Sequence, residues 1–187
     1  MMRMVLAALL VLVLAPSAYG HNGALGLYSD WTLTNCDDVS LIFETDSISL
    51  FYVKGQGPDL GKRVEFSIRA TSTNVLFSPA PVWSPKIILT VGDIETGISL
   101  AAASCMGVNE AVVYLGMIFV FNIGEENTFY VSVMPHPGSG IISITQCDPQ
   151  DTVVPVLGGA FIFSSFHNVC NVAVAGSSWG AIKSLYR

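Results

Sequence analysis

The side chains that could take part in catalysis are few and widely spaced in this sequence of 187 residues. Its histidines are His21, His136 and His167, and none stands in a His-x-x-x-His or His-Glu pattern that would bind a metal. The segment "GSSWG" (176–180) has the spacing of a serine-hydrolase elbow, but it lies in the C-terminal tail rather than between a strand and a helix. We therefore predict no catalytic residue, no cofactor and no metal site, and we expect a protein that is not an enzyme.

Carboxylates form four small groups in segments that we expect to be loops. The groups are Asp37 with Asp38, Asp93 with Glu95, Glu125 with Glu126, and Asp148 with Asp151. Two carboxylates can hydrolyse a glycosidic bond when the fold holds them about 5–9 Å apart, and loop acids can bind calcium. No Asp-x-Asp-x-Asp-Gly spacing occurs. Solvated loop charges are the simplest interpretation, with calcium binding and a catalytic pair as alternatives.

Aromatic side chains are the main indication of a binding function. Trp31 follows Tyr28 and Asp30 closely, and Trp83 lies in the proline-rich segment 78–85. An exposed tryptophan stacks well on a sugar ring or on a partner's apolar surface, although tryptophan in a small β-protein also serves in the core. Trp31 and Trp83 are therefore possible binding residues. Together with the loop acids they suggest an alternative function, carbohydrate binding or glycan processing.

The N-terminus has the features of a secretory signal peptide over residues 1–20. Arg3 precedes an apolar run at 5–15, Pro16 ends that run, and small residues at Ala18 and Gly20 mark a cleavage site before His21. Eleven apolar residues are too few for a membrane span, which needs about 20. We expect a secreted, periplasmic or cell-surface protein with no transmembrane segment after cleavage.

The charge of the chain argues against two classes of partner. Only 12% of its residues are charged, and removal of Arg3 leaves seven basic against fourteen acidic residues, a net charge of −7. Nucleic-acid binding needs lysine and arginine to neutralise phosphates, and attachment to anionic lipid needs the same residues. Both are therefore excluded, and we expect an envelope or extracellular protein, or a glycan, as partner. The sequence leaves the oligomeric state open.

Four cysteines, Cys36, Cys105, Cys147 and Cys170, favour two disulfides in an exported chain. Their sequence positions permit three pairings. We prefer Cys105–Cys147, which would link two strand ends, together with Cys36–Cys170, which would tie both ends of the chain.

Alternating apolar and polar residues predict β-strands along most of the chain. Examples are 46–53, 63–69, 128–134 and 141–147, with further strands at 25–28, 38–43, 74–77, 85–91, 97–104, 159–164 and 170–174. The segment "AVVYLGMIFVF" (111–121) is apolar at both alternating sets of positions, which predicts a central strand covered on both faces. About ten short strands at close spacing predict an all-β fold with one β-sandwich domain over 21–175, with a jelly roll as the alternative.

The C-terminal tail, 176–187, differs from the rest of the chain. Its apolar residues fall on one side of a short helix that Ser177 or Ser178 could cap. These residues are Trp179, Ile182, Leu185 and Tyr186. A nine-residue helix is unstable alone, so we expect it to dock on its own sandwich or to act as a recognition or sorting element that binds another protein.

Several segments resemble a group of uncharacterised secreted bacterial proteins with a cohesin-type, immunoglobulin-like β-sandwich. They are "GLYSD" (26–30), "VEFSI" (64–68), "GISLAAASC" (97–105), "PHPGSGIISITQC" (135–147) and "WGAIKSLYR" (179–187). The resemblance implies this fold and export, and no reaction. We expect a secreted or cell-envelope, non-catalytic module that serves in protein binding, adhesion or surface structure.

Overall fold

Strands joined by turns and loops make up the described part of the chain. The computed structural model describes residues 23–38, 43–55, 61–108, 110–124 and 128–164, and these contain fourteen strands and no helix. The strands are β1 (Gly23–Tyr28), β2 (Asp37–Asp38), β3 (Thr45–Lys54), β4 (Gly61–Ala70), β5 (Val75–Phe77), β6 (Val82–Trp83), β7 (Ile87–Asp93), β8 (Gly97–Met106), β9 (Val112–Asn122), β10 (Thr128–Met134), β11 (Ser143–Gln146), β12 (Val153–Pro155), β13 (Leu157–Gly158) and β14 (Ala160–Ser164).

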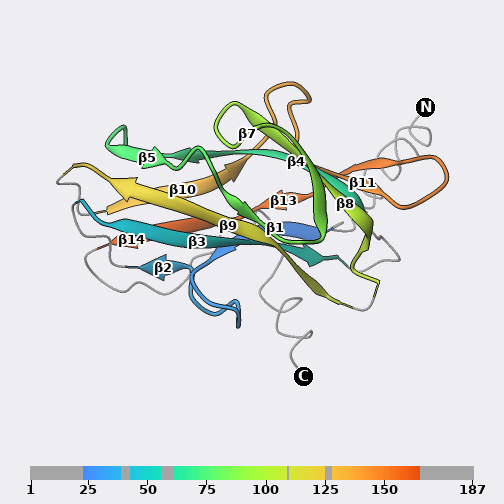
Figure 1. Ribbon diagram of the computed structural model, residues 1–187, viewed down its shortest axis with the longest axis horizontal. Coiled ribbons are helices and arrows are strands. Elements are labelled where there is room, and N and C mark those ends of the chain that lie inside the picture. Colours follow the sequence, from blue (N-terminus) through green and yellow to red (C-terminus); the bar gives the residue numbers. More distant parts are fainter. Residues whose placement is uncertain (1–22, 39–42, 56–60, 109, 125–127, 165–187) are drawn as a thin grey trace, which may run out of the picture.

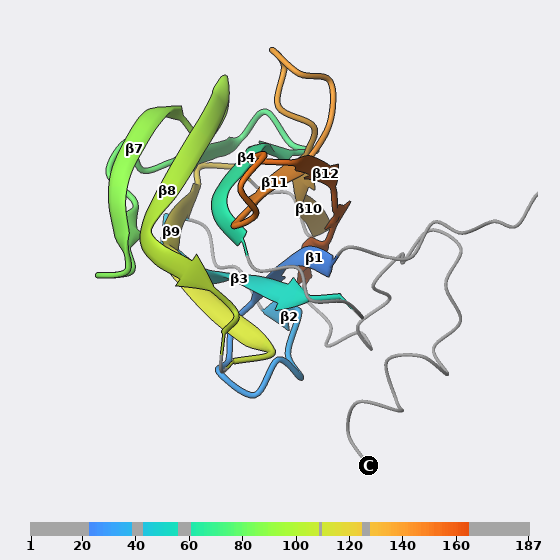
Figure 2. The same ribbon diagram turned by 90° about the vertical axis from the view of Figure 1, so that its right-hand side faces the viewer.

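The strands form two sheets that pack face to face (Figures 1 and 2). The first, which we call the β9 sheet, has the order β13-β1-β3-β9-β5, and β6 also pairs with β9. The second, the β4 sheet, has the order β12-β11-β4-β10-β14-β2, with β8 paired to β4 and β7 paired to β8. The prediction of an all-β sandwich is confirmed.

Alternation along the longest strands places the core between the sheets. On β3, Ile48, Leu50 and Tyr52 are fully buried, while Ser49 and Phe51 between them point the other way. On β4, Val64, Phe66 and Ile68 are likewise fully buried. The predicted central strand is β9, which pairs with β3 on one side and with β5 and β6 on the other. Burial of these two apolar rows is the main stabilising contribution to the fold.

β10 and β11 continue one another along the same edge of β4. Val131–Met134 pair with Ser67–Ala70, and Ser143–Gln146 then pair with the first residues of β4. The loop between them contains His136, whose amide donates to the Ile141 carbonyl at 3.0 Å and whose Nδ1 accepts from the Gly138 amide at 3.1 Å. His136 thus closes a surface turn, as its position between two prolines predicts.

A disulfide between Cys105 and Cys147 joins the strands on either side of β4 near the residue where β4 begins. Their Cα atoms are 5.9 Å apart, within the normal range for a disulfide. This preferred pairing is confirmed. Cys36 is buried, but Cys170 lies outside the described residues, so the Cys36–Cys170 pairing stays a prediction.

The chain near β13 moves from one sheet to the other. β12 and β14 belong to the β4 sheet, whereas β13 between them pairs in parallel with β1 of the β9 sheet. A Cβ atom on Gly158 would lie 2.5 Å from the Val133 carbonyl oxygen, and one on Gly159 would lie 3.2 Å from that of Leu25. Glycine is required because the chain passes between two backbones at this crossing.

Most predicted strands are present, with three kinds of difference. The short strands β6, β12 and β13 were not predicted, because two or three residues carry no detectable period. Asp37, which was expected in a loop, and Asp38, the first residue of the predicted strand 38–43, form β2, which pairs in parallel with β14. Residues 39–42 of that predicted strand lie outside the described residues. The signal peptide at 1–20, the strand at 170–174 and the tail helix at 176–187 lie outside the described residues. No helix long and apolar enough to cross a membrane occurs in the part of the chain that the structure describes.

Candidate binding face

The outer face of the β9 sheet is an uncharged surface formed by paired strands. β9 turns its bulky side chains alternately toward the core and away from it, and the inward set is fully buried. The outward set is only half-buried and consists of Tyr114, Met117, Phe119 and Phe121. They lie opposite outward-facing residues of β3, which are Phe51, Ser49, Ser47 and Thr45 respectively. No charged side chain interrupts this pair of rows.

Two exposed aliphatic side chains extend the surface beyond β9. Leu76 of β5 pairs opposite Phe121 and is 51% exposed, and Val82 of β6 pairs opposite Met117 and is 53% exposed. We call the outward side chains of β3, β5, β6 and β9, together with Tyr28 and Trp31, the aromatic face. Exposed apolar side chains gathered on one uncharged face are typical of an interaction site in soluble proteins.

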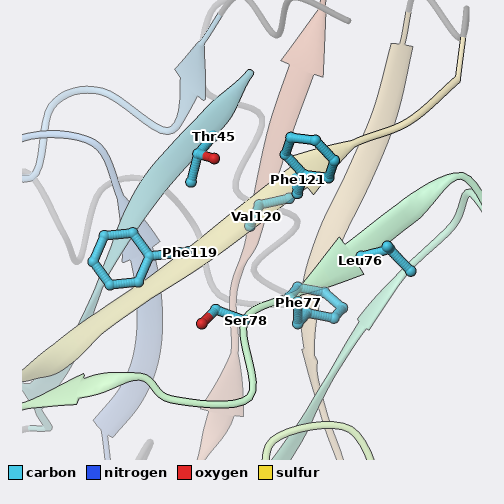
Figure 3. A pocket seen from close by; sticks show the side chains of 7 residues that line it. All are labelled: Thr45, Leu76, Phe77, Ser78, Phe119, Val120 and Phe121. Atoms are coloured by element: carbon cyan, nitrogen blue, oxygen red, sulfur yellow. The ribbon is translucent and has the colours of Figure 1, made fainter. Parts of the chain in front are cut away.

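A shallow depression of about 330 Å³ lies on the aromatic face between β5 and β9 (Figure 3). Figure 3 shows Phe119 and Phe121 on β9, Leu76 and Phe77 on the neighbouring strand, and Thr45 on β3. Its wall also includes Ser78 and Val120. The depression is apolar with two hydroxyl groups at its margin, so it could accept an apolar side chain of a partner.

At the other end of the aromatic face, Trp31 covers a cluster of rings. Its ring centroid is 4.5 Å from that of Tyr114 and 5.6 Å from that of Phe51, and Tyr28 contacts Phe51 at 6.0 Å. Phe51 is only 2% exposed although it points away from the core, whereas Trp31 is 70% exposed. Burial among these rings raises the pKa of the Tyr114 hydroxyl above its ordinary value. Trp31 therefore both shields Phe51 and presents a large ring to solvent.

The loop that carries Trp31 is held by the carboxylate of Asp30. Its Oδ1 accepts hydrogen bonds from the backbone amides of Thr34 (3.1 Å) and Asn35 (2.8 Å), and its Oδ2 accepts from the hydroxyls of Thr34 (2.7 Å) and Thr32. Burial alone would raise the pKa of Asp30, but these hydrogen bonds outweigh it and hold the pKa below 3.8. The ionised carboxylate thus fixes the position of Trp31 at neutral pH.

Trp83 lies in a groove of about 460 Å³ where one edge of the sandwich opens between the sheets, and this groove shares Phe77 and Ser78 with the depression on the aromatic face. Its ring covers Gly116 of β9, where a Cβ atom would be 2.5 Å away, and it is partly buried against the core. Asp93 and Glu95 line the same groove, next to the segment Pro79–Pro81. The structure therefore brings Trp83 together with two loop acids, as the glycan hypothesis requires, but it separates Trp83 from Trp31.

The carboxylate of Asp93 is already engaged in holding its own turn. The hydroxyl and amide of Thr96 donate to it, the amide at 2.8 Å, and the Glu95 amide donates at 2.9 Å. These contacts, chiefly those from Thr96, lower its pKa below 3.8. The lowered pKa favours the ionised carboxylate of Asp93 at neutral pH. No group of three His, Cys, Asp or Glu side chains within the described residues could hold a metal ion.

The sequence prediction found only part of the aromatic face. The sequence predicts Trp31 as a possible binding residue because it is a tryptophan. It predicts that both faces of the strand at 111–121 are covered, because that segment is apolar on both faces. Among the described residues, Trp31 lies over one end of that outer row, at Tyr114. The other predicted binding residues, Trp179, Ile182, Leu185 and Tyr186, lie outside the described residues.

No protein-family profile matches this chain, and no curated protein matches its sequence. Among solved structures, it is similar to a cohesin module from a family 33 glycoside hydrolase of Clostridium perfringens ATCC13124. The TM-score is 0.57 at 7% sequence identity, and the match covers 77% of this chain and 96% of that module. The chain has a cohesin-like β-sandwich fold. That part of the resemblance is confirmed, while membership of a group of secreted bacterial proteins stays a prediction.

Proposed function

We propose that this protein is a non-catalytic β-sandwich module that binds another protein through the aromatic face. The observation that carries the proposal is the uncharged outer surface of the β9 sheet, with Leu76, Val82 and Trp31 each more than half exposed. The cohesin-like fold supports a module of this kind. The scarcity of paired catalytic groups in the described residues is consistent with the same role.

The module acts outside the cytoplasm, in the secreted form or at the cell envelope. Residues 1–20 serve as the signal peptide, 21–175 form the sandwich domain, and 176–187 form a tail helix. The Cys105–Cys147 disulfide supports this location, because structural disulfides persist in oxidising compartments. The partner is accordingly another envelope or extracellular protein, and the binding serves adhesion or surface structure.

The chemistry of the aromatic face indicates how a partner would bind. Trp31 is held rigidly by the Asp30 loop and loses little conformational entropy on binding. The depression between β5 and β9 accepts one apolar anchor of the partner. Most of the binding free energy would come from these two places, since a few buried anchors dominate typical interfaces.

A capture experiment with matched variants tests this function. The purified protein is immobilised and exposed to an envelope extract of its native host, and the retained proteins are quantified. We expect Leu76→Lys and Trp31→Ala each to reduce the specific partner at least tenfold. Val153→Lys is the control, because Val153 is 49% exposed but lies on the short strand β12 of the other sheet. Equal retention by all variants, or an equal loss with Val153→Lys, would refute the proposal.

A second candidate function is glycan binding in the Trp83 groove. It is favoured by one observation, the placement of Trp83, Asp93 and Glu95 around the same groove. A glycan array with the purified protein tests it, and binding that falls with Trp83→Ala and with the exposed Glu95→Gln would support it. Trp83 packs against the core, so Trp83→Ala could lose binding by unfolding the protein. Glu95→Gln changes an exposed side chain and tests the same groove in a folded protein. Binding that survives both substitutions, or no binding at all, excludes this site.

A further inference from the structure

Strand β7 is a long edge strand with one unpaired side. Within the described residues it pairs only with β8, and Figure 2 shows it at the outer margin of the β4 sheet. The other strands that end a sheet, β2, β5, β12 and β13, and the short β6 beside β9, contain only two or three residues each, whereas β7 contains seven. Short edge strands are one way in which proteins avoid pairing with other chains. β7 lacks this protection.

The side chains of β7 are also unusual for an edge strand that faces only solvent. Ile88, Leu89 and Val91 are 68%, 56% and 58% exposed. No charged residue and no proline occurs between Ile87 and Gly92, although lysine and proline commonly protect such edges. An exposed, apolar, uncharged edge with unpaired backbone groups fits an added β-strand. The chemistry of the partner is thus an extended segment with apolar side chains.

The two ends of β7 carry opposite charges. Lys86 precedes the strand, is about half exposed and contacts Glu110 at 2.6 Å through its Nζ. Asp93 ends the strand, and the exposed Glu95 follows it. An ammonium group has three donors, so Lys86 can bind a further carboxylate. In an antiparallel pair, the start of one strand lies beside the end of the other. A partner strand therefore places opposite charges beside Lys86 and Asp93 only if it also begins with a cation and ends with an anion.

We propose that β7 pairs antiparallel with β7 of a second copy of this chain, about a two-fold axis. This partner meets each requirement of the edge: it is extended, apolar and uncharged along its length, with a cation at its start and an anion at its end. The uncharged centre lets two acidic molecules approach without like charges in contact. The pairing joins the two β4 sheets into one continuous sheet and covers Leu89 and Val91 on both copies.

The symmetry of this pairing limits its register. In a two-fold antiparallel pair, one residue lies on the axis and faces its own copy. β7 has a β-bulge between Ile87 and Leu89, so we place Leu89, the first residue after the bulge, on the axis. This brings the Lys86 end of one copy near the Asp93 end of the other. Cα atoms of directly opposed residues are about 4.5–5.5 Å apart in such a pair, which is within reach of a disulfide. The interface uses the edge of the β4 sheet, whereas the aromatic face belongs to the β9 sheet.

Sedimentation equilibrium of the full secreted chain over a range of concentrations tests the pairing. We expect a monomer–dimer equilibrium, and we expect Leu89→Lys to raise the dissociation constant at least tenfold by placing two like charges at the axis. Val153→Lys is the matched control and should leave the equilibrium unchanged. A monomer at every concentration, or a dimer that Leu89→Lys leaves intact, would overturn the proposal. Melting curves verify that both variants remain folded.

Cross-linking provides a second readout that does not depend on a loss of association. Under mild oxidation, Leu89→Cys should form a covalent dimer on a non-reducing gel, whereas Val153→Cys should remain monomeric. Both positions are about half exposed, so a difference reflects proximity rather than reactivity. Equal cross-linking of the two variants would contradict a pairing through β7.

Discussion

The outward sides of the two strands β4 and β9 differ sharply, although their inward sides are alike. On β4, the residues that point away from the core include Arg63, Glu65 and Arg69, and the Arg63 Nε atom lies 3.5 Å from a Glu65 carboxylate oxygen. On β9, the corresponding positions hold Tyr114 and Phe119 among other apolar residues. Both strands bury their inward side chains completely.

This difference distinguishes the apolar residues that the fold requires from those that it does not require. A two-layer sandwich needs one apolar face on each sheet, and strict alternation as on β4 supplies it. A second apolar face, as on β9, adds nothing to the core between the sheets. Under the proposed function, this outward apolar row of β9 contacts the partner.

Removal of the Cys105–Cys147 disulfide should have the largest effect on stability. The bridge closes a loop with a sequence separation of 42 residues, and the chain-entropy relation predicts a loss of roughly 4 kcal/mol in the free energy of unfolding. Urea denaturation of the Cys105→Ala/Cys147→Ala variant measures this loss, with Ser104→Ala as control. Because the bridge lies in the β4 sheet, partner capture by the folded variant should persist. A loss of capture without unfolding would show that the two faces are not independent.

Phe51→Ala should be the next largest perturbation, since it removes the buried centre of the aromatic face. Phe51 is 2% exposed and contacts Tyr28, Trp31 and Tyr114, so we expect a loss of about 3 kcal/mol. Ser49→Ala, which points to the same side of β3, should change stability by less than about 0.5 kcal/mol. Chemical denaturation compares them. A loss below about 1 kcal/mol for Phe51→Ala would mean that the Trp31 loop does not pack on the face.

The smallest effect concerns Asp30, which orders the Trp31 loop. The pKa of Asp30 in the folded protein lies below 3.8. Asp30 therefore makes its full contribution to the free energy of unfolding at a pH above its pKa in the unfolded chain, and this contribution is lost as the pH falls through its pKa in the folded protein. The loss therefore occurs below about pH 4. Carboxyl chemical shifts followed by NMR should show that Thr34→Val raises the pKa of Asp30 and leaves that of Asp93 unchanged. An unaltered Asp30 pKa would refute the role of the Thr34 hydroxyl.

The sequence predicted the strands well because alternation is a local property. Segments 63–69 and 128–134 were identified correctly, since each has one polar and one apolar row. The aromatic face was missed because the same apolar row on β9 fits either a covered strand or an open binding surface. The groove at Trp83 depends on the pairing of β6 with β9, a contact between residues distant in the sequence that carries no local signal.

Site-specific photo-cross-linking in the native host tests most directly whether the aromatic face is the binding surface. A photoreactive residue replaces Leu76 on the aromatic face or Tyr130 on the outer side of the β4 sheet, which are 51% and 43% exposed. We predict a discrete protein adduct from position 76 and none from position 130. Adducts from position 130 alone would contradict the assignment of the aromatic face as the surface that binds the partner.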